Sequence, residues 1–125
     1  MKNNDIKKYY LSEKVAIEIG IEESIMLWNI YFWVSFNQKG AGDMHYHEGK
    51  YWTYNTVRDF VEQYPFWTKG MIRRILKNLE HGGYIEIGRF NKFGYDKTKW
   101  YTVTEKTLDV LENDNGEVES DYSTC

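Results

Sequence analysis

The segment from residue 68 to residue 104 constrains the fold of this chain most, because it joins a one-sided helix to a hairpin. At about 100° per residue, the apolar side chains of its first half share one helical face: Ile72, Ile75, Leu76 and Leu79. The opposite face is basic apart from one glycine: Gly70, Arg73, Arg74 and Lys77. The pattern predicts a helix that is capped by Thr68, packs through one face and offers cations on the other.

A hairpin is expected after this helix. Gly82 and Gly83 supply a left-handed stop, and two β-rich runs, YIEIGRF and TKWYTVT, flank the turn-like sequence NKFGYDK. Residues 57–64 have helical apolar spacing, and Pro65 forbids their continuation, so three residues separate them from Thr68. Two helices at that spacing, followed by a hairpin, predict a winged helix-turn-helix. The expected fold is mainly α with a small β wing, in the α+β class.

The segments before residue 57 are shorter. Ser12 can cap a short helix that Gly20 ends. Residues 37–50 hold three glycines and no apolar periodicity, so we expect a loop there, followed by a short strand in the sequence YWTY. Either of the next two residues, Asn55 or Thr56, can cap the helix that ends before the proline.

Length and composition indicate one domain. With 125 residues and 42% apolar content, the chain can bury a real core. A last short helix is expected from Glu105 to Leu111, and the residues after it are acidic with little to bury. We therefore expect a single winged helix-turn-helix domain over residues 1–112 and a disordered acidic tail over residues 113–125.

The helix expected from Glu23 to about Gln38 is apolar all round. Its apolar side chains point in every direction: Ile25, Leu27, Phe32, Val34 and Phe36. A helix of this kind must be covered on all sides, and a domain of this size can hardly surround it. We therefore expect a homodimer through residues 23–38. The alternative is a monomer in which the helix is fully buried at the centre.

Positive charge is concentrated in the second half of the chain. Residues 66–106 hold nine Lys or Arg against four Asp or Glu, whereas residues 1–65 hold seven against nine and residues 107–125 hold none against six. The net charge of −3 hides this local excess, and at ordinary salt only charges within about 10 Å matter. A run of charged residues is usually only a solvated surface. Here, however, the basic residues are concentrated on one helix and its hairpin, which favours a nucleic-acid-binding surface.

No catalytic or metal-binding pattern stands out. The sequence shows no recognisable Ser, His and Asp arrangement, phosphate-cradling glycine loop or buried carboxylate pair, so we expect no enzyme and no cofactor. His45 and His47, beside Asp43 and Glu48, could bind zinc, but the spacing is weakly specific and we expect no metal. The single cysteine, Cys125, permits no internal disulfide.

The sequence also argues against a membrane location. No run approaches the ~20 apolar residues that span a bilayer, and the first dozen residues lack the apolar run of a signal peptide. We expect a cytoplasmic protein without membrane contacts. Its 5 Trp, 11 Tyr and 6 Phe residues recur in clusters that we expect to be core or interface. Stacking on single-stranded bases is the alternative use of such clusters.

With these segments in place, the chain resembles the N-terminal winged-helix domains of phage and plasmid replication proteins from Gram-positive hosts, the replisome-organizer and DnaD-like group. The strings that carry the resemblance are EGKYWTYNTVRDFVEQYPFWTKGMIRRILKNLEHGGYI and FNKFGYDKTKWYTV. With a looser match of the first two helices, it covers residues 11–111. The resemblance implies binding to origin or duplex DNA, oligomerisation through the N-terminal helices and no catalytic centre.

The sequence departs from this family after the last helix. Family members commonly continue into a second region that engages helicase-loading partners, whereas here a short acidic tail follows. The chain is therefore expected to be either a short member that acts as a DNA-binding regulator or a fragment of something longer. The resemblance also implies replication proteins as partners.

Roles can be assigned to the expected DNA-binding residues. A recognition helix over residues 68–81 would enter the major groove, and a wing over residues 84–104 would lie on the backbone. Arg73 is the expected base reader, because arginine can bond guanine in bidentate fashion. The other cations would hold phosphates. The full candidate set is Thr68, Lys69, Gly70, Arg73, Arg74, Lys77, Arg89, Asn91, Lys92, Lys97 and Lys99.

A second class of function stays open. Winged helices can use the same surfaces to dock proteins, so a protein-interaction module or a transcriptional regulator is the alternative. The acidic residues between Asp109 and Asp121 could compete with DNA for the basic helix, bind a basic partner or only aid solubility.

Overall fold

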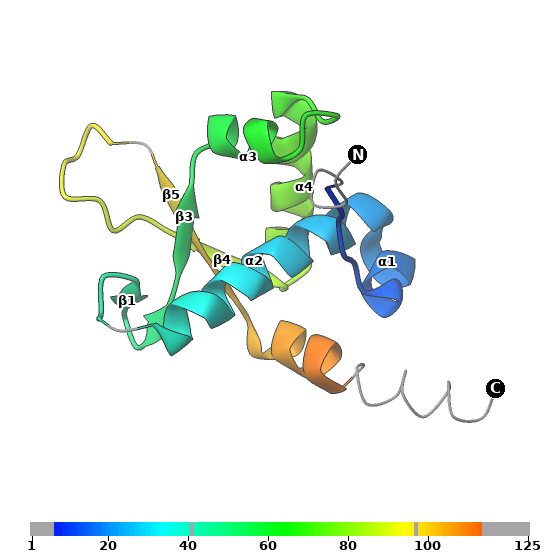
Figure 1. The fold of residues 1–125 in the computed structure, drawn as a ribbon, viewed down its shortest axis with the longest axis horizontal. Helices are drawn as coiled ribbons and strands as arrows, with labels where there is room; N and C mark the ends of the chain where they lie inside the picture. Colours follow the sequence, from blue (N-terminus) through cyan, green and yellow to red (C-terminus); the bar gives the residue numbers. More distant parts are fainter. Residues whose placement is uncertain (1–6, 41, 97, 114–125) are drawn as a thin grey trace, which may run out of the picture.

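The computed structural model describes residues 7–40, 42–96 and 98–113. The elements run in the order α1 (Glu13–Ile19), α2 (Ile21–Lys39), β1 (Tyr46–His47), β2 (Lys50–Tyr51), β3 (Thr53–Asn55), α3 (Val57–Gln63), α4 (Lys69–His81), β4 (Ile85–Gly88) and β5 (Lys99–Val103). Figure 1 shows the helices grouped around a small sheet, with the loop between β4 and β5 extending at one end. The fold belongs to the α+β class, as the sequence predicts.

One glycine ends α1 and begins α2. The Ser12 hydroxyl caps α1 by accepting a hydrogen bond from the Val15 amide at 3.3 Å, and Gly20 ends the helix, as expected. Gly20 has φ 130°, and a Cβ at this position would collide with the Glu23 carboxylate, so only glycine fits. Because Gly20 is also the N-cap of α2, that helix begins at Ile21, two residues before the expected start.

One face of α2 is buried and the other is not. Met26, Leu27, Ile30 and Val34 belong to the core. Phe32, Trp33 and Phe36 are 50%, 39% and 58% exposed. The expectation of a helix fully buried within a single copy is therefore wrong for the part of the chain that is described.

Local capping fixes the two helices that follow. Thr56, one of the two expected caps, accepts a hydrogen bond from the Asp59 amide, while the Asp59 carboxylate accepts one from the Thr56 amide, both at 3.0 Å. Thr68 caps α4 as predicted, by accepting a hydrogen bond from the Met71 amide at 3.1 Å. Each hydroxyl satisfies an amide that has no partner inside its helix.

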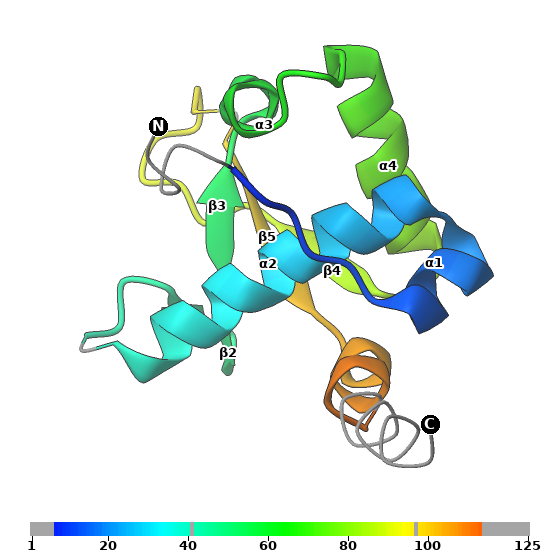
Figure 2. The same cartoon turned by 45° about the vertical axis from the view of Figure 1, so that its right-hand side comes forward.

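The connection between α3 and α4 is short and aromatic. Both of its aromatic side chains were expected to pack, but only Trp67 is buried, and Phe66 is 55% exposed. Tyr64, at the C-cap of α3, is also buried, and burial raises its pKa far above the ordinary value. Figure 2 shows α3 leading into α4, which runs along an outer edge of the molecule.

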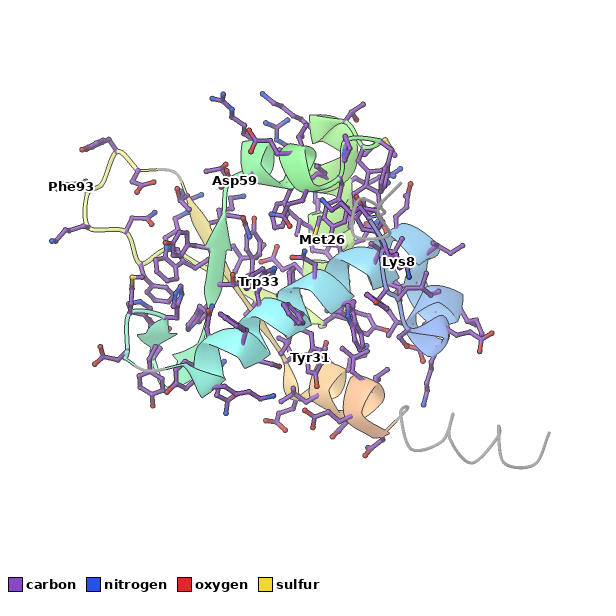
Figure 3. All side chains as sticks on the ribbon, viewed as in Figure 1. Lys8, Met26, Tyr31, Trp33, Asp59 and Phe93 are labelled. Atoms are coloured by element: carbon purple, nitrogen blue, oxygen red, sulfur yellow. The ribbon has the colours of Figure 1, made fainter. Side chains whose placement is uncertain are left out.

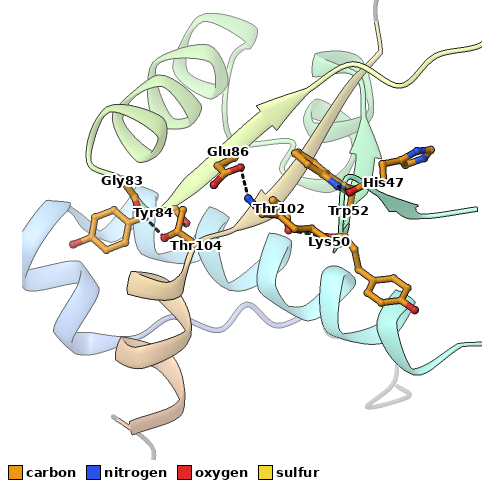
Figure 4. Close-up of polar contacts among 9 residues, drawn as sticks. His47, Lys50, Trp52, Gly83, Tyr84, Glu86, Thr102 and Thr104 are labelled. Carbon is orange, nitrogen blue, oxygen red and sulfur yellow. Dashed lines mark hydrogen bonds and ion pairs between the residues drawn. The ribbon is translucent and has the colours of Figure 1, made fainter. Parts of the chain in front are cut away.

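Gly83 turns the chain from α4 into β4. Gly82 keeps a right-handed helical conformation, so the left-handed stop is made by Gly83 alone, with φ 81°. The Tyr84 amide then donates a hydrogen bond to the Leu79 carbonyl at 3.0 Å, which completes a Schellman-type end. The Thr104 hydroxyl donates to the Gly83 carbonyl at 2.7 Å and ties this corner to the end of β5 (Figure 4).

The sheet is antiparallel, with the strand order β3-β5-β4. Tyr101 lies opposite Thr53 on one side and Ile87 on the other. Its ring contacts Phe60 of α3 at 5.8 Å between centroids, so the central strand packs directly on the helices. The predicted hairpin from β4 to β5 is confirmed.

The segment expected to be a loop contains a small hairpin of its own. Tyr46 and Tyr51 are paired between β1 and β2, and the predicted strand YWTY is therefore divided between β2 and β3. Two contacts join this hairpin to the three-stranded sheet (Figure 4). The Thr102 hydroxyl donates a hydrogen bond to the Tyr51 carbonyl at 2.6 Å, and Lys50 forms an ion pair with Glu86 at 2.7 Å.

The final helix spans residues 105–113, two residues beyond its expected end. The acidic tail predicted over residues 113–125 lies, apart from its first residue, outside the described residues. Among the described residues, no helix combines the length and the apolar character that crossing a bilayer requires.

Candidate nucleic-acid interface

The two faces of α4 differ as the sequence predicts. The apolar face is buried in the core: Ile72, Ile75, Leu76 and Leu79. The polar face is exposed over the residues expected to contact DNA: Thr68, Lys69, Gly70, Arg73, Arg74 and Lys77. The helix is thus held through one side, and the other side meets solvent along most of its length.

Two polar contacts fix the rotation of α4 against α2. Arg74 donates a hydrogen bond to the Glu22 carboxylate at 2.9 Å. One turn later, Asn78 donates to the Glu23 carboxylate at 2.8 Å. Both contacts lie on the same margin of α4, so they favour one orientation of the basic face. The pairing also neutralises part of the Arg74 charge, which sequence analysis did not anticipate.

The other Lys and Arg side chains of α4 differ from Arg74 in what they contact. Among the described residues, Lys69, Arg73 and Lys77 have no hydrogen bond or ion pair to another side chain. They lie within about two turns of one another along the exposed face. Three cations so arranged create a local positive potential that a polyanion can use.

The N-terminus of α4 is open to solvent. The Thr68 hydroxyl is already committed to the Met71 amide, whereas the first amides of the helix have no partner inside it. A Cβ added at Gly70 would meet nothing closer than the Thr68 hydroxyl at 3.9 Å, so the packing of this chain does not require a glycine there. Free backbone amides and open space at Gly70 together allow an anion to approach the N-terminus of α4.

The cations of the hairpin are exposed where they are described. Lys92 and Lys99 project from the loop and from β5, and Arg89 lies just beyond the end of β4. Lys97 falls outside the described residues. The pKa of Tyr101 is raised to about 12, chiefly by burial and also by the charge of Glu80, whereas Arg89 acts to lower it. β4 contacts α4, so the base of the hairpin lies beside this helix.

Asn91 acts inside the hairpin rather than at its surface. Its side-chain amide donates to the carbonyls of Asp96 and Thr98 at 3.0 and 2.7 Å, and its oxygen accepts from the Trp100 indole at 2.8 Å. The Thr98 amide also donates to the Asp96 carboxylate at 2.9 Å, which holds the pKa of Asp96 below its usual value. These bonds give the loop a defined shape.

Two loop residues that sequence analysis did not select are the most exposed aromatics of the hairpin. Phe93 and Tyr95 lie at the far end of the loop with their ring centroids 5.4 Å apart. The sequence signal was present, because the turn-like run NKFGYDK places two large rings where no partner strand can cover them.

The two histidines considered as metal ligands pack against aromatic rings. His47 stacks on Phe90 with centroids 4.5 Å apart, and His45 stacks on Tyr54 at 5.6 Å. Both rings also lie beside Trp100. Within the described residues, no three His, Cys, Asp or Glu side chains gather as a metal site would require.

The surfaces of α4 and of the hairpin offer several groups that an anion can contact. The exposed cations project from α4 and from the hairpin, and the open helix N-terminus adds backbone donors. Searches against protein-family models, curated proteins and solved structures find no match to this chain.

Proposed function

We propose that this chain is a sequence-preferring, double-stranded DNA-binding protein with a winged helix-turn-helix architecture. In this reading α3 and α4 are the helix-turn-helix, and the hairpin from β4 to β5 is the wing. The strand order β3-β5-β4 supports it, because the wing is then built on the strand that precedes α3. We assign the protein to phage or plasmid replication initiation on the sequence resemblance alone.

The observation that carries the proposal is the set of unpaired cations on α4. In the described part of the chain, Lys69, Arg73 and Lys77 neutralise no carboxylate, so their charge is available to phosphates or base edges. Arg73 is the proposed base reader in the major groove. Lys69 and the wing cations would hold phosphates and set the register.

Selection from a pool of random duplexes tests the proposal. The protein is incubated with the pool at moderate salt, and the retained duplexes are sequenced after several rounds. A sequence-preferring protein enriches a common motif, and the Arg73→Ala variant enriches it less. Retention without enrichment would leave only nonspecific binding, and no retention at all would remove DNA from the proposal.

We also propose that α2 joins two copies into a homodimer. Phe32, Trp33 and Phe36 contact one another, with centroids 5.2 to 6.4 Å apart, and form an exposed aromatic cluster. Residues 32–36 carry no charge, so the same patch from two copies can meet without repulsion. A symmetric contact of this kind is the usual basis of a dimer.

Light scattering coupled to gel filtration tests the dimer. The unaltered chain should elute with twice its monomer mass, and Phe36→Lys should return it to the monomer mass. Ile17→Lys is the matched control, because Ile17 is an apolar residue of α1 that is also exposed, at 79% against 58% for Phe36. An unaltered chain that stays monomeric at high micromolar concentration would rule out this interface.

A further inference from the structure

The outer end of the wing presents aromatic rings instead of burying them. Phe93 and Tyr95 are 55% and 74% exposed. In Figure 3, Phe93 is labelled at the extremity of the loop. Moving an apolar ring out of water lowers the free energy. Two exposed rings side by side at a loop tip therefore point to a ligand or partner that covers them.

The loop does not depend on these rings for its shape. The side chain of Asn91 makes the three hydrogen bonds described above, and Asp96 is bonded to the Thr98 amide. A loop braced by polar contacts at its base can hold exposed rings in place. Little ordering is then required when something binds them.

A hollow of about 510 Å³ lies between this loop and the beginning of α3. Phe93 and Tyr95 contribute to its lining from the loop, and Asn55 and Thr56 contribute from the end of β3 and the cap of α3. Lys99 also lines it, and Asp96 is the one acidic residue among the lining side chains. The hollow thus combines aromatic surface, neutral hydrogen-bonding groups and a cation.

We propose that this hollow receives an unpaired nucleobase where duplex DNA passes into a single strand. The base would stack on the wing rings, with its edge toward Asn55 and Thr56 and its phosphate near Lys99. Aromatic stacking accepts any base, because every base has a π face. A paired base cannot enter, since its face is covered within the duplex. The inference rests on the proposed DNA binding and names the DNA form that the wing selects.

Fluorescence anisotropy with two matched probes tests the preference. One probe is a closed duplex, and the other is the same duplex with a short single-stranded extension. The unaltered chain should bind the extended duplex more tightly, by roughly five- to a hundredfold, which is the range for stacking one base. Equal affinity for the two probes would overturn the inference while leaving duplex binding intact.

Two variants assign the effect to the rings. Phe93→Ala combined with Tyr95→Ala should abolish the preference for the extension, because the rings that stack on the base are removed. Binding to the closed duplex should stay within about twofold, because every cation is retained. Tyr95→Phe keeps the ring and should keep the preference. A double variant that retains the full preference would show that the rings are not responsible.

Photochemical crosslinking locates the base directly. The extended duplex carries 5-iododeoxyuridine at its first unpaired position, and after irradiation the crosslinked peptide is identified by mass spectrometry. The crosslink should fall on Phe93 or Tyr95. A crosslink to a residue that does not line the hollow would overturn the inference even if the extension were preferred. Failure to bind either probe would instead overturn the proposed DNA binding itself, so the two failures are distinguishable.

Discussion

Two neighbouring arginines on α4 differ in what they contact. Arg74 is hydrogen-bonded to Glu22 of α2, whereas Arg73 has no partner among the described residues. An arginine already paired with a carboxylate has to give up that contact before it can hold a phosphate or a base. The two residues therefore make a matched pair for testing which cations serve DNA.

We predict that Arg73→Ala weakens binding to the preferred duplex by about 1–3 kcal/mol and relaxes the sequence preference. Arg74→Ala should cost clearly less, because the lost charge is already partly neutralised by Glu22. Anisotropy titrations of both variants against a preferred and a random duplex measure the difference. Equal losses for the two variants would show that pairing with Glu22 does not matter.

Gly70 gives a second residue-scale prediction. Its Cβ position is open, so Gly70→Ala should raise the free energy of unfolding by up to about 1 kcal/mol through helix propensity. The added methyl group should at the same time weaken DNA binding, because it stands where a phosphate backbone would approach. Urea unfolding and anisotropy of one variant provide both readouts. A variant that is more stable and binds equally well would leave Gly70 without a role in binding.

At the scale of elements, the Thr68 cap stabilises the end of α4 that belongs to the proposed DNA-binding surface. Thr68→Ala removes the hydrogen bond to the Met71 amide and should lower the free energy of unfolding by about 1 kcal/mol. Thr68→Asn should restore most of the loss, because asparagine is also a good N-cap. Urea unfolding of the three proteins checks this order. An alanine variant as stable as the parent would mean that the cap contributes nothing.

The sequence predicted those elements whose signals are local. The α4 helix has a threonine cap, a one-sided apolar face and a glycine stop, and all three are within its own residues. The antiparallel hairpin from β4 to β5 likewise follows from two β-rich runs around a turn. For these elements, the residues nearby in sequence determine the structure.

The features that sequence analysis missed depend on residues far apart in the chain. Arg74 and its partner Glu22 are separated by 52 positions, so no local pattern could reveal the pairing. The β1-β2 hairpin is fastened by Thr102 and Glu86, which lie in the other sheet. The exposure of Phe66 was missed because the aromatic clusters of the sequence were expected to be core or interface.

At the scale of the whole molecule, the proposed dimer and the proposed DNA site constrain each other. A symmetric contact through α2 would carry two copies of α4, related by a two-fold axis. Proteins of that symmetry bind inverted half-sites. We therefore predict that the motif enriched from random duplexes is an inverted repeat, and that the monomeric Phe36→Lys variant enriches a single half-site. An inverted repeat enriched by that monomeric variant would separate DNA recognition from the α2 contact.

With a net charge of −3, the chain can bind DNA only if its cations are gathered on one surface. Anisotropy of a labelled duplex across a salt series tests this most directly. Each phosphate neutralised contributes about −0.9 to the slope of log affinity against log salt, and we predict a slope of about −4 or steeper. No binding even at low salt, or an affinity that salt does not change, would contradict a DNA-binding surface on α4 and the wing.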